Sequence, residues 1–223
     1  IGAIANTTDK THILYKDSDL KSRSTFECNT DDVLHQIGAE EEEEVASRVV
    51  GPDNCVRMYV ETDYTLFQNK GSVANVTTYM TGLFSQVSAL YTNEAVNLTL
   101  HNLYVWNVTD PFTGPTASDY LNQFRTAKNG VFNGDLAHFV GINGLGGVAY
   151  VDVLCNGYYG VGYSSINATY SNVPTYSWSV EVLTHEIGHN LGSSHTHACA
   201  WNGNNTAIDG CAPTYNSAYA EGT

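Results

Sequence analysis

Hydrophobic residues recur along the chain at two spacings, and the first of these predicts strands. In residues 55–63, Val, Met and Val alternate with Arg, Tyr and Glu, which is the period of a half-buried strand. Residues 97–107 predict a second strand, whose alternation slips near Asn102 as at a β-bulge. Residues 136–142 are almost wholly apolar, as in a strand covered on both faces. Residues 148–154 alternate again and predict a fourth strand.

The second spacing predicts helices. Residues 76–90 repeat apolar side chains at steps of four, three, four and three, as an amphipathic helix does. Residues 116–130 predict a shorter helix, in which Ser118 is the candidate N-cap, Asp119 suits the first turn and Gly130 marks the end. Strands and helices alternate along the chain without internal repeats. The expected fold class is therefore α/β (α+β), with a mixed sheet that carries helices.

Residues 1–52 differ from the rest of the chain. They contain scattered polar runs and five consecutive glutamates at residues 40–44, and a run of like charge is usually a solvated helix face or a linker. We predict that residues 1–52 are an N-terminal extension or the tail of a propeptide, and that residues 53–223 are the main domain. The alternative is that residues 1–52 are a peripheral part of that domain. The first residues lack the basic start and apolar core of a secretory signal, which could already have been removed.

Composition narrows the class of protein. Of the 223 residues, 42% are hydrophobic, which suffices for a packed core, and no stretch approaches the ~20 apolar residues of a membrane span. The net charge is −14, with 9 basic and 23 acidic residues. We therefore expect neither nucleic acid nor an anionic membrane surface as a partner, because both are bound through Lys and Arg.

The chain has five cysteines, an odd number, so at least one is free, bound to a metal or paired outside the chain. Cys199 and Cys211 enclose a short polar loop and are the best candidates for one disulfide. Two disulfides would fit an oxidising compartment. Together with the acidic composition, this favours a secreted, extracellular protein.

The sequence HEIGHNLGSSH, residues 185–195, carries the clearest chemical signal. If residues 177–191 form a helix, four apolar residues make one stripe along it. His185 and His189 each follow a member of this stripe by two positions, and two positions rotate a helix by about 200°. The two histidines therefore project away from the core. Because they are four residues apart, both imidazoles can reach one metal ion.

The end of this helix supplies the rest of the predicted site. Gly192 suits the left-handed conformation that ends helices, so the chain turns back and His195 can meet the ion from another side. Three neutral imidazoles and a water form a four-coordinate zinc site with an open position, which is the catalytic arrangement. Glu186 can reach that water. The alternatives are structural histidines held by hydrogen bonds, or His197 in place of His195; His138 is expected to be a hydrogen-bonded core residue.

The extended motif HExxHxxGxxH is that of the metzincins. With CVRMYVETDYTLF, LGGVAYVDVLC and WSVEVLTHEIGHNLGSSHTHAC, residues 53–223 resemble the adamalysin or reprolysin branch of these zinc metallopeptidases, and most of all its bacterial secreted members. The resemblance implies an endopeptidase domain with a mixed five-stranded sheet and an active-site helix across a cleft. It also implies that the strand containing Gly147, Val148, Ala149 and Tyr150 is the edge that pairs with extended substrate. A simple turn into the strand also explains its glycines.

One feature departs from the metzincin pattern. Metzincins carry a methionine turn downstream of the third histidine, whereas Met58 and Met80, the only methionines here, both lie upstream. We therefore expect the lower subdomain to be incomplete, because the sequence is a fragment, has lost its tail or comes from an incomplete relative. Cys155 is then expected to pair with a cysteine in the missing part.

The resemblance also implies a mechanism. Zn²⁺ activates a water, Glu186 acts as general base, and the substrate is a protein or peptide. Ca²⁺ is a candidate second ion, for which the sequence shows no ligand set. The competing hypotheses are a latent zymogen fragment and an inactive binding or adhesion module. The oligomeric state is not predicted.

Cys28 is the last candidate residue. Several metzincin propeptides place a thiolate on the zinc to keep the enzyme latent, and Cys28 lies upstream of the domain, where such a thiol would be. The residues around it lack the usual Pro and Gly. A disulfide, with Cys55 as the partner, is therefore the preferred alternative.

Overall fold

The chain forms two compact units. In the computed structural model, one unit spans residues 27–194 and the other comprises residues 1–26 and 195–223. The residues that the structure describes are 2–3, 12–13, 28, 30, 55–198, 201 and 208. In the smaller unit, the short strands β1 (Gly2–Ala3) and β2 (His12–Ile13) pair in antiparallel fashion. The predicted division between residues 52 and 53 stays a prediction.

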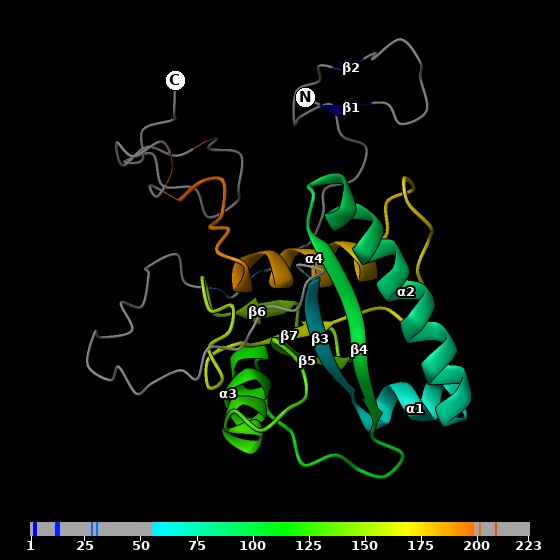
Figure 1. Ribbon diagram of the computed structural model, residues 1–223. Coiled ribbons are helices and arrows are strands. Elements are labelled where there is room, and N and C mark those ends of the chain that lie inside the picture. Colours follow the sequence, from blue (N-terminus) through cyan, green and yellow to red (C-terminus); the bar gives the residue numbers. More distant parts are fainter. Residues whose placement is uncertain are drawn as a thin grey trace, which may run out of the picture. The chain divides into compact units, whose positions relative to one another are not determined.

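The larger unit contains a five-stranded sheet in the order β4-β3-β5-β7-β6, shown in Figure 1. Neighbouring strands are parallel except β6, which runs antiparallel to β7 at the edge. The strands are β3 (Cys55–Thr62), β4 (Asn97–Val105), β5 (Leu136–Gly141), β6 (Gly147–Ala149) and β7 (Val161–Ser165). The helices are α1 (Tyr64–Lys70), α2 (Val73–Asn93), α3 (Ala117–Lys128) and α4 (Trp178–Asn190). The predicted mixed α/β sheet is confirmed.

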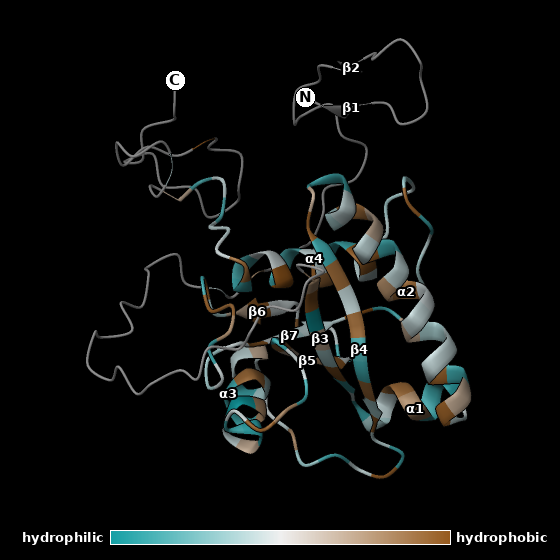
Figure 2. Ribbon diagram, viewed as in Figure 1, coloured by the Kyte–Doolittle hydropathy of each residue, from teal (hydrophilic) through white to brown (hydrophobic). Residues whose placement is uncertain are grey.

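The first two predicted strands form as expected. Strand β3 pairs in parallel with β4, and the register shifts so that Met58 faces Leu100 while Tyr59 faces Asn102. His101 is therefore the extra residue of a bulge, as the slip in the sequence pattern predicts. Because a parallel pair needs a crossover connection, α1 and α2 lie between the two strands in the chain. Figure 2 shows hydrophobic and hydrophilic residues interspersed along β4 and α2.

The predicted helix over residues 76–90 is the centre of α2, which begins at the N-cap Ser72. Its buried residues include four of the five predicted apolar positions: Val76, Met80, Leu83 and Val87. Helix α1 was not predicted. It has seven residues and one buried side chain, Leu66, so it carries no periodic signal. Among the described residues, no helix has both the length and the apolar character needed to cross a membrane.

The N-cap of helix α3 lies two residues before the predicted one. It is Thr116, so the prediction of Ser118 is wrong. The Thr116 hydroxyl accepts from the Asp119 N–H at 3.2 Å, and the Asp119 carboxylate accepts from the Thr116 N–H at 3.0 Å. This reciprocal capping box satisfies two N–H groups at once, which a cap at Ser118 would not. The helix ends as predicted, with Asn129 and Gly130 at positive φ of 41° and 76°.

The predicted strand over residues 148–154 is only partly correct, because β6 covers Gly147–Ala149. Asp152 and Cys155 take left-handed conformations, with φ of 56° and 66°, and these end any extended run. The sheet continues instead with β7, which was not predicted. Strand β7 is buried on both faces but has the sequence VGYSS, in which Val161 is the only aliphatic residue. Its burial comes from neighbouring elements rather than from its own pattern.

The two faces of β6 pack against different elements. Val148 belongs to the core cluster under α3, together with Leu121, Phe124, Phe139 and Tyr163. Gly147 faces α4, because a Cβ placed there would meet the Glu186 carboxylate. Helix α4 is also tied to α2, since the Tyr91 hydroxyl donates to the Thr184 carbonyl at 2.7 Å. The edge strand therefore lies between the α3 core and α4.

His138 is a buried polar residue of the sheet, as predicted. It is fully buried on β5, and its Nε2 lies 2.8 Å from the Ser164 hydroxyl of β7. Burial lowers the pKa of His138 to about 3. The imidazole is therefore neutral in the folded chain at any pH near neutrality.

We predict that His138 makes folding sensitive to mild acid. Its folded-state pKa lies below the unfolded value, so the stabilisation is complete above about pH 6.5 and is lost as the pH falls from there towards about pH 3. Between about pH 7 and about pH 5 the loss is about 2 kcal/mol. Urea unfolding at both pH values measures it. His138→Gln, which keeps a donor near Ser164, should reduce the difference between the two pH values by that amount.

The comparison with the variant is essential because another buried group acts in the opposite direction. Burial raises the pKa of the Asp63 carboxyl to about 6, so this residue becomes less destabilising as the pH falls through that value. Equal pH dependence in wild type and His138→Gln would contradict the prediction.

Candidate metal centre

Helix α4 presents the predicted histidine pair on the side away from its core stripe. Val180, Leu183 and Ile187 are buried, and this stripe fixes the rotation of the helix. His185 and His189 then lie one turn apart, with their Nε2 atoms 3.0 Å from each other. Both nitrogens face one point, as the spacing of four residues predicts.

The other ring nitrogen of His189 has a partner that the sequence did not reveal. Nδ1 lies 2.6 Å from the Ser193 carbonyl oxygen, which can only accept a hydrogen bond. Nδ1 therefore carries the proton, and Nε2 keeps its lone pair for a ligand. The turn at Gly192, with φ of 101°, brings this carbonyl back to the helix. The predicted left-handed glycine is confirmed, and it orients a histidine as well as ending the helix.

Cys28 lies beside the histidine pair. Its Sγ is 3.5 Å from His189 Nε2 and 3.9 Å from Glu186 Oε2. The ligand atoms of Cys28, His185 and His189 all lie within 4.8 Å of one another. Imidazole nitrogen and thiolate sulfur are the ligands that zinc prefers. The two rings and the thiol thus form a donor set that fits a zinc ion.

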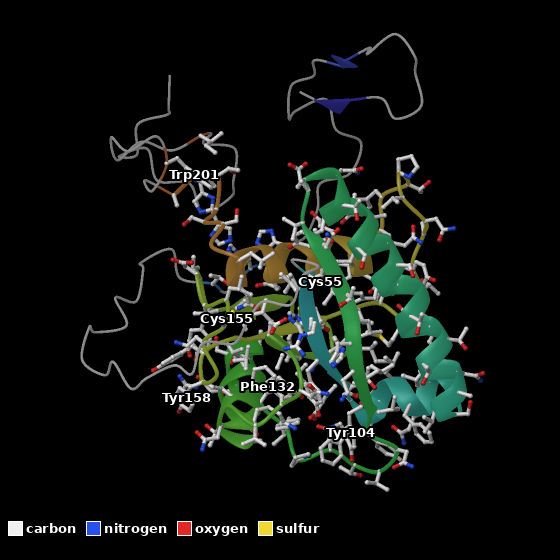
Figure 3. All side chains as sticks on the ribbon, viewed as in Figure 1. Cys55, Tyr104, Phe132, Cys155, Tyr158 and Trp201 are labelled. Atoms are coloured by element: carbon white, nitrogen blue, oxygen red, sulfur yellow. The ribbon has the colours of Figure 1, made fainter. Side chains whose placement is uncertain are left out.

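The cysteines of the described residues are free. They are Cys28, Cys55 and Cys155. The predicted disulfide between Cys28 and Cys55 is therefore wrong, because Cys28 points at His189 instead. Figure 3 places Cys55 at the start of β3 and Cys155 in the loop after β6. The predicted partner of Cys155 was assigned to a missing segment, and that pairing stays a prediction; Cys199 and Cys211 lie outside the described residues.

His195 belongs to the smaller unit, as the first residue of its second segment. Its role as third ligand, and the alternative role of His197, therefore stay predictions. Within that unit the two imidazoles stack with ring centroids 4.9 Å apart. The Trp201 indole N–H donates to the His195 carbonyl at 2.7 Å. Within the part of the chain that the structure describes, no second group of three or more His, Cys, Asp or Glu side chains is placed to hold an ion, and Ca²⁺ stays a prediction.

Glu186 is completely buried next to the histidine pair. Its Oε1 has no hydrogen-bond partner among the described residues. A Cβ on Gly147 would lie 2.4 Å from this oxygen, so the carboxylate and the edge strand approach each other only because residue 147 is glycine. Burial raises the pKa of the Glu186 carboxyl to about 8. A buried carboxyl with one unsatisfied oxygen beside two convergent imidazoles is suited to proton transfer at a metal-bound group.

The open edge of β6 is already occupied. Cys28 forms a parallel bridge with Gly147. The Thr30 hydroxyl lies 3.0 Å from the Ala149 nitrogen, from which it accepts, and 3.2 Å from the Ala149 oxygen. Thr30 was not among the predicted site residues. Its position two residues after Cys28 could have identified it, because side chains two residues apart in an extended chain lie on the same side.

The predicted substrate-binding residues lie at or next to this edge. Gly147, Val148 and Ala149 form β6, and Tyr150 follows its last residue. The structure thus brings the predicted edge, Glu186 and the histidine pair together around Cys28.

Comparison with known proteins identifies the family of the chain. Residues 53–223 match Metallo-peptidase family M12. Among solved structures, the chain is similar to metalloproteinase-II from Bacteroides fragilis, at 12% identity and a TM-score of 0.38. That similarity covers 64% of this chain and 43% of the other, so the chain spans less than half the length of that structure. The family match covers most of the chain and confirms the resemblance carried by the histidine motif: the chain belongs to Metallo-peptidase family M12.

Proposed function

We propose that this chain is the latent form of a zinc-dependent endopeptidase that hydrolyses peptide bonds of protein substrates. The observation that carries the proposal is the convergence of two imidazoles on one point beside a buried, partly unsatisfied carboxyl. His185, His189 and, as the predicted third ligand, His195 would hold the ion. A bound zinc ion would lower the pKa of a coordinated water and polarise the peptide carbonyl.

Glu186 supplies the proton transfer. A group with a pKa near the working pH can both take up and release a proton efficiently. Burial brings the Glu186 carboxyl into that range, with its pKa at about 8. In this role Glu186 takes a proton from the attacking water and hands it to the leaving amine.

The edge of β6 would position the substrate. Gly146 turns its carbonyl towards β7, where it accepts from the Ser165 N–H at 2.7 Å. Because main-chain groups alternate along a strand, Gly147 and Ala149 turn theirs to the open edge. An extended peptide can pair with these groups, and Tyr150 would flank it.

Cys28 would keep the chain latent. Its thiol occupies the place next to His189 that a substrate carbonyl or water would need. Burial, followed by the Glu186 charge, raises the pKa of the Cys28 thiol. A thiolate at this position therefore depends on a bound cation. A secreted location, expected from the composition, stays a prediction.

We predict that Glu186→Gln removes catalysis and keeps the metal. In a Cys28→Ser background, cleavage of casein should fall by roughly 10²- to 10⁴-fold. Zinc content by elemental analysis should not change, because the imidazoles are intact. Glu181→Gln is the matched control, since Glu181 lies on the same helix and bonds to Tyr176 instead. Retained turnover in Glu186→Gln would remove this residue from the role.

Metal binding is tested separately. The chain should bind about one zinc ion. In the Cys28→Ser variant, dialysis against a chelator should remove both zinc and casein cleavage until zinc is restored. His189→Ala should lose the ion, whereas His101→Ala, at the exposed bulge of β4, should keep it. Equal zinc content in the two variants would contradict the proposed centre.

Latency gives a further prediction. Cys28→Ser should cleave casein without any activation step, because serine binds zinc far more weakly than a thiolate does. Cys55→Ser is the control and should stay as inactive as wild type. The Cys55 thiol, on β3, contacts the Thr99 hydroxyl of β4 and not a histidine. If Cys28→Ser were no more active than Cys55→Ser, the thiol would not be the inhibitory group.

A further inference from the structure

Thr30 makes three contacts that the proposed latency of Cys28 does not require. Its side chain is buried, with 9% of the residue exposed. The hydroxyl oxygen lies 3.0 Å from the Ala149 nitrogen, 3.2 Å from the Ala149 oxygen and 3.4 Å from Glu186 Oε2. One side chain therefore touches both main-chain groups of an edge residue and the proposed base.

The chemistry of a hydroxyl decides which of these contacts are hydrogen bonds. A hydroxyl has one proton to donate and lone pairs that accept. Thr30 accepts from the Ala149 N–H and donates to the nearer acceptor, the Ala149 carbonyl. The Thr30 hydroxyl thus makes the hydrogen bonds with the main chain of Ala149 that a neighbouring strand would otherwise make. The Glu186 carboxylate lies further from the hydroxyl, which therefore contacts it without donating a hydrogen bond to it.

The register links this contact to the thiol. Cys28 forms a parallel bridge with Gly147, and Thr30 contacts Ala149. The step of two residues from Cys28 to Thr30 therefore matches the step of two residues from Gly147 to Ala149 on β6. Residues two apart in an extended chain share a side. The thiol therefore reaches His189 while the hydroxyl reaches Glu186 and the strand edge.

We propose that Thr30 is a second inhibitory group, separable from Cys28. Its hydroxyl pairs with the main-chain N–H and carbonyl of Ala149, so another peptide cannot bind these two groups at the same time. The hydroxyl also contacts Glu186. The edge thus recognises the sequence Cys-x-Thr, through a thiol at the metal and a hydroxyl on the strand. Removing the thiol alone leaves Ala149 covered. The inhibitory role rests on the proposed function, whereas the pairing at Ala149 does not.

The pairing is tested by amide hydrogen exchange, which needs neither metal nor activity. In Thr30→Val, which keeps the shape but has no hydroxyl, the Ala149 amide should exchange about tenfold faster than in wild type. In Thr30→Ser it should exchange as in wild type. The Ala137 amide, which donates to the Gly160 carbonyl at 2.8 Å within the sheet, is the internal control for an intact fold. Equal Ala149 exchange in Thr30→Val and wild type would overturn the inference.

The inhibitory role is tested in the Cys28→Ser background. Adding Thr30→Val should raise casein cleavage severalfold over Cys28→Ser alone, and adding Thr30→Ser should leave it unchanged. If Cys28→Ser is active and Thr30→Val adds nothing, Thr30 is not inhibitory. If no variant cleaves casein while exchange at Ala149 responds as expected, the proposed function fails and the Thr30 pairing stands.

Discussion

The end of α4 is attached to the sheet by hydrogen bonds, and the histidine pair depends on this attachment. The Asn190 amide donates to the Tyr150 carbonyl at 2.9 Å and to the Val161 carbonyl at 3.1 Å. In return, the Asp152 N–H donates to the His189 carbonyl and the Val153 N–H to the Asn190 carbonyl. The last carbonyls of a helix normally lack partners within it. Here the connection between β6 and β7 supplies them, so the edge strand and the histidine helix move as one body.

Glycines in β6 and β7 leave room for buried polar side chains. Gly147 leaves room for Glu186, and Gly162 passes beside the His138 ring, where a Cβ would lie 2.6 Å from it. Each glycine allows a buried polar side chain to approach the backbone closely. Burial of these polar groups is unfavourable unless they are paired. His138 pairs with Ser164, and the Asn190 amide nitrogen pairs with two carbonyls. The Glu186 Oε1 is one of several buried polar atoms without a hydrogen-bond partner among the described residues, and it is the one on a carboxyl group beside the histidine pair.

Sequence reasoning succeeded where the signal is local. The spacing of His185 and His189, the glycine turn at residue 192 and the strands β3 and β5 follow from periodicity and backbone preference. It failed where burial is imposed by distant segments. Strand β7 has no alternation of its own, and β6 is shorter than its pattern suggests because left-handed residues follow it. The placement of Thr30 was not predicted, because it contacts a residue more than a hundred positions away. A thiol at the metal was one hypothesis for Cys28, which came from the family resemblance, and the disulfide was preferred because the local sequence lacks the usual Pro and Gly.

That separation has a consequence for how the proposed inhibitory contact of Thr30 can be released. Thr30 and Ala149 are 119 positions apart in one chain. As long as the chain is continuous, the thiol and hydroxyl rebind after each dissociation, at an effective concentration set by the connecting segment rather than by the solution. A single cut between Thr30 and Cys55 makes the same contacts intermolecular. The covalent connection then no longer sets their effective concentration, and one hydrolysed bond weakens the cover on the β6 edge without any change in the sheet itself.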